Sequence, residues 1–126
     1  MGKQPAQEKP KNLTTEQIDA FDMLWRQLSS LYTDIESLAK KKQDGIMSQT
    51  RVSAINRVLV DVQELLKDEP SLKFLALLDD EKLPQNADAL LFLGQYKSAM
   101  ATFRAKNTFN ASGFQKWNGT DRGTVR

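Results

Sequence analysis

Residues 14–42 read TTEQIDAFDMLWRQLSSLYTDIESLAKKK, and this stretch decides the fold class. Its apolar residues recur at alternating spacings of three and four, which is typical of an α-helix with one buried face. This apolar stripe consists of Ile18, Phe21, Trp25, Leu28, Tyr32, Ile35 and Ala39, broadened by Leu24, Leu31 and Leu38. Thr14 and Gln17 have the spacing of a capping box, which predicts that the helix begins beside them. The lysines at its end favour the negative end of the helix dipole.

A second helix is predicted after the Asp44-Gly45 turn, antiparallel to the first and forming a long N-terminal hairpin with it. Ser48 is the expected N-cap, and apolar residues follow at helical spacing as far as Leu66. The helix must end before Pro70, because the residue that precedes a proline is pushed away from helical geometry.

Two further apolar segments extend the helical pattern. We expect a short third helix to begin at Pro70 or Ser71 and to carry the leucines up to residue 78. A fourth helix is expected from a cap at Asn86 to residue 106, with Gly94 inside it as a break or a close-packing point. The sequence therefore predicts an all-α fold, a compact bundle of about four helices over residues 14–106.

Both ends of the chain are basic and lack periodicity. Residues 1–13 carry three lysines against one glutamate, and residues 106–126 carry four basic side chains against one aspartate. We predict a disordered N-terminal arm over residues 1–13 and a flexible C-terminal arm over residues 107–126. Such arms are either solvated tails or surfaces that meet an acidic protein or phosphate groups.

The composition argues against catalysis and against cofactors. The chain contains no Cys and no His, which excludes thiol and imidazole chemistry and nearly all zinc, haem and iron–sulfur sites. The acidic run Asp79, Asp80 and Glu81, with Asp88 nearby, could offer oxygen ligands to a cation. A solvated turn near a helix N-terminus explains these acids equally well. We therefore predict no catalytic residue, no cofactor and no metal: the chain is not an enzyme.

No targeting or membrane segment is predicted. The first residues contain no apolar run of the kind that a signal peptide needs, and no run approaches the roughly 18 apolar residues of a membrane span. We expect a cytoplasmic protein that does not bind membranes.

The first helix is longer than the second, so part of its apolar stripe needs another cover. The fourth helix, a second copy of the chain or a partner protein could supply it. Trp25 and Tyr32 lie on this stripe, at core or interface positions. Because exposed apolar stripes usually find a partner, we expect self-association through this helix and a homo-oligomer, a dimer being the simplest.

The C-terminal arm is unusual because large aromatic residues are rare in disordered tails. Its rings could dock on a protein groove or on the chain's own bundle, at about 1.5–3 kcal/mol for each buried ring. Together with the basic residues, they could instead stack on single-stranded nucleic acid. We favour a non-enzymatic helical protein–protein interaction module, an adaptor or regulatory subunit, with a nucleic-acid-associated protein as the alternative. The candidate partner-binding residues are Trp25, Tyr32, Phe109, Phe114, Lys116, Trp117 and Arg122.

Overall fold

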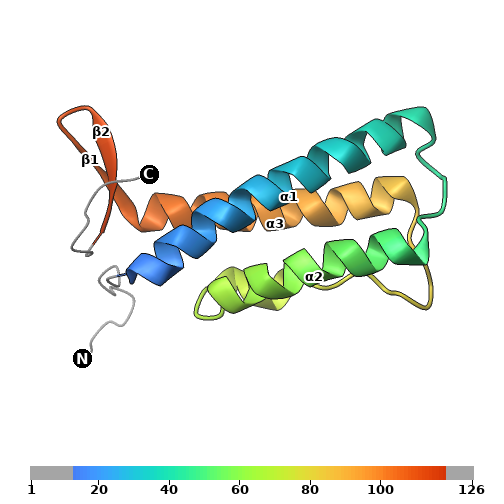
Figure 1. The fold of residues 1–126 in the computed structure, drawn as a ribbon, viewed down its shortest axis with the longest axis horizontal. Coiled ribbons are helices and arrows are strands. Elements are labelled where there is room, and N and C mark those ends of the chain that lie inside the picture. Colours follow the sequence, from blue (N-terminus) through green and yellow to red (C-terminus); the bar gives the residue numbers. More distant parts are fainter. Residues whose placement is uncertain (1–12, 119–126) are drawn as a thin grey trace, which may run out of the picture.

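The computed structural model describes residues 13–118, and this part of the chain is mostly helical (Figure 1). Its three α-helices are α1 (Thr15–Lys41), α2 (Gln49–Leu65) and α3 (Asn86–Lys106). A short 3-10 helix, η1 (Pro70–Phe74), and two strands, β1 (Thr108–Ala111) and β2 (Phe114–Trp117), complete the described elements. The prediction of a helical protein is confirmed. Of the predicted N-terminal arm, only Leu13 lies within the described residues, and it is buried.

The start of α1 is the predicted capping box. The Thr14 hydroxyl accepts the Gln17 backbone N–H at 3.0 Å, and the Thr14 N–H donates to the Gln17 side-chain oxygen at 2.9 Å. Ser48 caps α2 in a similar way, because its hydroxyl accepts the Arg51 N–H at 3.1 Å. These contacts satisfy backbone donors that a helix leaves without partners in its first turn.

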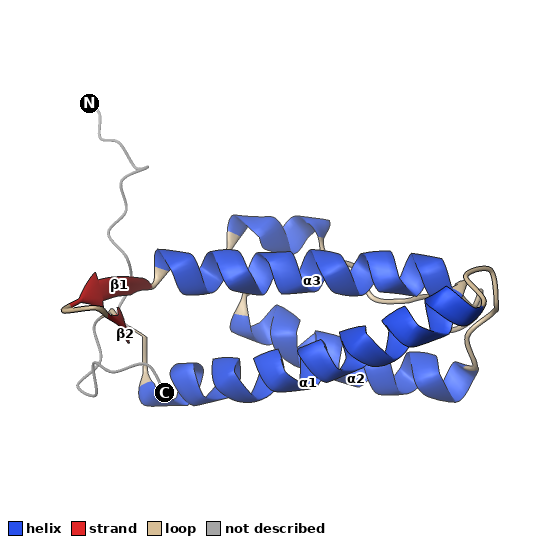
Figure 2. Cartoon of the chain, turned by 90° about the horizontal axis from the view of Figure 1, so that it is seen from above, coloured by secondary structure: helices blue, strands red, loops and turns tan. Residues whose placement is uncertain are grey.

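The helices lie lengthwise and α1 packs most extensively on α3, with a smaller contact to α2 (Figures 1 and 2). The pairing of α1 and α2 expected from the sequence is therefore not the main one in the fold. Between residues 13 and 118, no helix is both long and apolar enough to cross a membrane.

The prediction of a third α-helix reaching residue 78 is wrong. The chain forms η1 up to Phe74 and then continues without helix to Gln85. Of the five residues in η1, none is buried, and in the following segment Leu75 and Leu78 enter the core. The run of leucines is therefore a surface turn followed by an extended segment that covers one side of the bundle.

Side chains from α2 and α3 hold this extended segment in place. The Asn56 carboxamide bonds Leu78 twice: its nitrogen donates to the Leu78 carbonyl and its oxygen accepts the Leu78 N–H, both at 2.9 Å. The Gln63 amide donates to the Leu75 carbonyl at 3.2 Å, and the Tyr96 hydroxyl donates to the Ala76 carbonyl at 2.8 Å. These bonds replace the backbone partners that a helix or sheet would provide.

Burial raises the pKa of the Tyr96 hydroxyl above its ordinary value, although the hydrogen bond that it accepts from Gln63 lowers it. We expect Tyr96→Phe to cost about 0.5–1.5 kcal/mol at neutral pH, the net value of a typical hydrogen bond. Above about pH 10 the unfolded tyrosine ionises before the folded one, so the wild-type protein loses the stability that Tyr96 contributes.

The measurement is urea unfolding of the wild-type protein and the Tyr96→Phe variant at neutral pH and above about pH 10. The difference between the two proteins should shrink as the pH rises. A difference that stays constant across this range would contradict the assignment, because deprotonation of lysines affects both proteins alike.

The junction between α1 and α3 uses Asn86 differently from the prediction. Asn86 is the first residue of α3 rather than its cap, and it is buried. Its side-chain nitrogen donates to the Lys42 carbonyl at 2.9 Å and so satisfies the end of α1. Gly94 does not interrupt α3; a Cβ built on it would meet the Tyr32 ring at 3.7 Å, an ordinary packing distance.

The predicted C-terminal arm, residues 107–126, begins with a β-hairpin, which its sequence pattern does not predict. The strands β1 and β2 pair antiparallel, with Thr108 opposite Trp117 and Ala111 opposite Phe114. Ser112 and Gly113 form the two-residue turn with φ of 53° and 85°. Positive φ at both positions matches the twist of the flanking strands, and glycine adopts it without strain. The hairpin lies beyond the end of α3 (Figure 1).

Candidate functional site

The two aromatic residues predicted on the α1 stripe lie against the chain's own α3. The Lys97 ammonium of α3 is 5.2 Å from the centre of the Trp25 ring and 4.9 Å from that of Tyr32, within cation–π range. Trp25 also stacks on Phe21, with ring centres 6.0 Å apart. Both rings are half-buried, so they contribute only part of their surface to the outside.

The rest of the stripe is largely covered within the chain. Its five fully buried members are Ile18, Phe21, Leu24, Leu28 and Ile35. The sequence leaves open whether another helix of the chain, a second copy or a partner protein covers this stripe. In the structure, the chain's own helix α3 packs on it. Met23 is the large apolar residue of α1 that remains exposed.

Trp117 lies in the core rather than on a surface. Only 1% of it is exposed, and its ring forms a T-shaped pair with Phe21, with centres 5.3 Å apart. Phe21 also stacks on Phe103 near the end of α3, so the hairpin is packed on both helices. The Trp117 indole nitrogen has no hydrogen-bond partner among residues 13–118, so apolar burial is what holds the ring there.

A hydrogen-bonded link fixes the hairpin to the end of α3. The Asn107 side chain donates to the Phe103 carbonyl and the Thr108 hydroxyl donates to the Arg104 carbonyl, both at 2.8 Å. The Asn118 N–H donates to the Asn107 carbonyl at 2.8 Å and extends the strand pairing by one residue. The direction in which the hairpin presents its side chains is therefore set by α3.

The hairpin has one face turned to the bundle and one face turned outward. Because strand side chains alternate, the register places Phe109, Ala111, Phe114 and Lys116 together on the face opposite Trp117. Phe109 is 46% exposed and Phe114 is 70% exposed. Lys116 lies directly opposite Phe109 in the neighbouring strand. We call these four residues the outer hairpin face. Arg122, the remaining predicted partner-binding residue, lies outside the described residues.

A groove at the other end of the bundle was not predicted. It has a volume of about 520 Å³ and lies between the segment that precedes α3 and the first turns of α3. Its apolar walls are Ile46, Leu78, Leu83, Pro84, Leu91 and Phe92. Two of these residues, Ile46 and Leu91, are each 62% exposed. We call this feature the α3 groove.

Backbone hydrogen bonds build the α3 groove. The Met47 N–H donates to the Pro84 carbonyl at 2.9 Å, and Ile46 pairs with Gln85 in a single antiparallel bridge. The Asn86 N–H donates to the Gly45 carbonyl at 2.8 Å. These contacts join the loop after α1 to the segment before α3, so Ile46 and the continuous stretch 78–92, which are distant in sequence, form one surface.

The rim of the α3 groove is acidic. Asp79, Asp88 and Lys82 line it, and Asp80 and Glu81 are exposed beside them. The Asp79 carboxylate accepts the N–H groups of Glu81 and Lys82 at 2.8 and 3.1 Å, which closes the turn. These two bonds hold the pKa of Asp79 below its ordinary value, so the rim keeps this charge into acidic solution.

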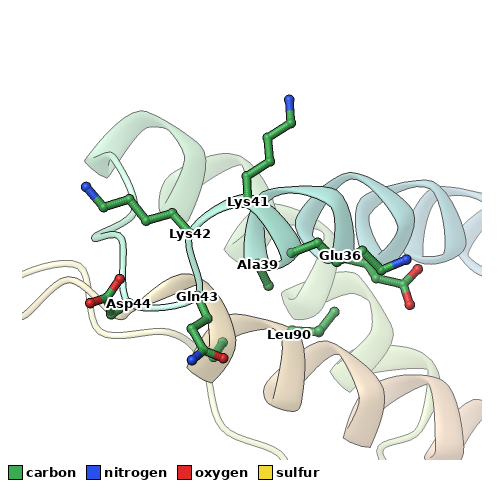
Figure 3. Close-up of a pocket in the computed structure, with 9 residues that line it drawn as sticks. Glu36, Ala39, Lys41, Lys42, Gln43, Asp44 and Leu90 are labelled. Atoms are coloured by element: carbon green, nitrogen blue, oxygen red, sulfur yellow. The ribbon is translucent and has the colours of Figure 1, made fainter.

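A second hollow, of about 650 Å³, lies between the end of α1 and the start of α3 (Figure 3). Lys40, Lys41 and Lys42 line it, which suggests an anion site. Figure 3 shows Lys41 and Lys42 extending away from the hollow in different directions. Their ammonium groups therefore do not converge on one ligand.

Between residues 13 and 118, no group of three Asp or Glu side chains is placed to hold a metal ion. No protein-family model, curated protein or solved structure matches this chain.

Proposed function

We propose that this chain is a non-enzymatic protein-binding module, an adaptor or regulatory subunit, and that it binds through the outer hairpin face. The observation that carries the proposal is the pair of exposed rings, Phe109 and Phe114, on a hairpin whose other face is fixed in the core by Trp117. Exposed aromatic residues are typical of binding surfaces, because each buried ring contributes about 1.5–3 kcal/mol.

The rigidity of the hairpin supports this choice over the rest of the surface. A side chain on a preorganised element loses less conformational entropy when it binds than one on a mobile loop. The link through Asn107 and Thr108 and the burial of Trp117 supply that preorganisation. Phe74, which is equally exposed at 71%, is a single ring on the short helix η1, where the Lys73 ammonium lies 5.3 Å from its centre.

The test is a comparison of two sets of variants. A photo-crosslinking phenylalanine analogue placed at position 114 should trap a partner protein, whereas the same analogue at position 74 should not. Phe109→Ser with Phe114→Ser should abolish the interaction, and Phe74→Ser should leave it intact. All variants should melt within a few degrees of the wild-type protein, because exposed substitutions change stability by about 0.5 kcal/mol or less. Equal crosslinking from positions 114 and 74 would refute the proposal.

The alternative is binding of single-stranded nucleic acid by stacking on the same two rings. Lys116 beside Phe109 favours it, since phosphate contacts need cations. The neighbouring cation Lys106 is already paired with Glu69 at 2.9 Å, and the two described strands carry no cation other than Lys116. Oligonucleotide binding that weakens steeply with added salt would support this alternative, and we expect none at physiological salt.

A further inference from the structure

The outer hairpin face and the α3 groove are complementary in character. The hairpin presents two exposed phenylalanines and the Lys116 ammonium. The groove presents apolar walls that include the exposed Ile46 and Leu91. Its rim carries Asp79 and Asp88 against one cation, Lys82, with Asp80 and Glu81 beside them. Rings that enter the groove would leave water together with its apolar walls, while the lysine would meet the acidic rim.

The two surfaces cannot meet within one molecule. They lie at opposite ends of α3, whose 21 residues span about 31 Å at 1.5 Å per residue. Figures 1 and 2 both show the hairpin at one end of the bundle and the loop after α1 at the other. The burial of Trp117 and the link to α3 prevent the hairpin from folding back. Only a second molecule can bring a hairpin to this groove.

We propose that the outer hairpin face of one copy docks in the α3 groove of a second copy, so that the chains associate head to tail. This inference rests on the proposed function and names a second copy of the chain as a partner. The contact is heterologous: each pair leaves one hairpin and one groove unused, so association continues into rings or open chains.

We expect this association between copies to be weak. Two partly exposed rings and a lysine make a small interface, and contacts that bury less than about 1,200 Å² are typical of transient complexes. We expect dissociation constants in the micromolar range or above and association that increases with protein concentration. Sedimentation velocity over a wide range of concentration is therefore the appropriate measurement.

The decisive experiment mixes two variants, each of which has lost one surface. The first carries Phe109→Ser and Phe114→Ser in the hairpin, and the second carries Ile46→Ser and Leu91→Ser in the groove. Each variant alone should remain monomeric, because every contact needs one intact surface of each kind. The mixture should form a one-to-one dimer that does not grow further. Phe74→Ser serves as the matched control and should associate like the wild-type protein.

A charge exchange tests the polar part of the contact. Lys116→Glu should weaken association several-fold, and Asp88→Lys in the partner copy should restore part of the loss. Both residues are at least partly exposed, so the two variants should fold like the wild-type protein, which circular dichroism can verify. Absence of any restoration would show that Lys116 and Asp88 do not meet.

The outcomes separate this inference from the proposed function. A wild-type protein that stays monomeric at the highest concentration, or a mixture that forms no dimer, overturns head-to-tail docking. Loss of association in the hairpin variant but not in the groove variant also overturns it, yet leaves the hairpin as the binding surface. If the hairpin variant associates like the wild-type protein and position 114 traps no partner, both proposals fail.

Discussion

Trp117→Ala is expected to lower the free energy of unfolding by about 3–5 kcal/mol, the range for removing a large aromatic side chain from a core. Trp117 is the residue of the described hairpin that belongs to the buried core, where it packs on Phe21. Its removal leaves a cavity beside Phe21 and also frees the hairpin from the bundle. Urea unfolding followed by far-ultraviolet circular dichroism measures this loss.

Two further variants make the prediction specific. Phe114→Ala changes a ring of the same hairpin that is mostly exposed, and it should alter stability by about 0.5 kcal/mol or less. Trp117→Phe should cost less than Trp117→Ala, because a ring remains and the indole nitrogen gives up no hydrogen bond to residues 13–118. If Trp117→Ala and Phe114→Ala have equal effects, the hairpin is not packed on the bundle as described.

The same substitution has a consequence for binding. With Trp117 removed, Phe109 and Phe114 are still present but no longer held in a fixed direction. Binding through the outer hairpin face should then weaken although neither ring has changed, because the hairpin must be ordered again when it binds. A Trp117→Ala variant that is folded and binds like the wild-type protein would show that preorganisation plays no part.

Local signals in the sequence were sufficient to predict α1 and α2. The capping residues Thr14 and Ser48 contact backbone groups only three residues away. The apolar spacing along each helix is likewise set within a few turns. Such features depend on neighbours in the chain, which is why they can be read without the fold.

The segment after Phe74 could not be predicted in this way. Its apolar residues suggest a helix, but its extended form depends on side chains from distant helices. Asn56 and Tyr96 bond its backbone from positions 22 and 20 residues away, and no local pattern announces these contacts. Tertiary hydrogen bonds therefore decided the conformation against the local pattern.

The hairpin region contains a turn signal that is too weak by itself to predict two strands. A Ser-Gly pair at residues 112–113 is a turn signal, but the flanking strands are short and mostly polar, so alternation is weak. The aromatic residues stand out in the sequence as a group, but the sequence does not show which one of them is buried. That choice depends on strand register and on Phe21, at the opposite end of the chain.

The sequence does not predict the α3 groove because two segments that are distant in sequence form it. Ile46 follows α1, Leu83 precedes α3 and Leu91 lies within α3. The sequence points to the acids beside it, but only as candidate oxygen ligands for a cation or as a solvated turn. These acids form the rim of an apolar groove only because the fold brings the loop after α1 next to them.

Asn56→Ala is expected to lower the free energy of unfolding by about 2–4 kcal/mol, because it leaves two backbone groups of the buried Leu78 without partners, each at a cost of about 1–3 kcal/mol. In the wild-type protein, the Asn56 carboxamide bonds both the Leu78 N–H and the Leu78 carbonyl. Two such groups together would cost about 2–6 kcal/mol. Because this site is only partly buried, water can reach the freed groups in part, so we expect a loss in the lower half of that range. Urea unfolding provides the value.

Asn56→Asp separates the two hydrogen bonds. The carboxylate can still accept the Leu78 N–H, but it cannot donate to the Leu78 carbonyl and would face that oxygen with a negative charge. We expect Asn56→Asp to be at least as destabilising as Asn56→Ala at neutral pH. Gln95→Ala, an exposed amide on α3, is the matched control and should change stability by about 0.5 kcal/mol or less.

Asn56 also links the stability of the fold to the proposed binding surface. Leu78 begins the segment that forms one wall of the α3 groove, and Asn56 fixes that segment on the bundle. At temperatures where the Asn56→Ala variant remains folded, head-to-tail association should therefore be weaker than in the wild-type protein. The outer hairpin face of the Asn56→Ala variant should still bind an intact α3 groove. The variant with Phe109→Ser and Phe114→Ser supplies such a groove, so a mixture of the two variants should still form a dimer. Equal loss of both abilities would mean that Asn56→Ala disturbs the whole bundle rather than the groove wall alone.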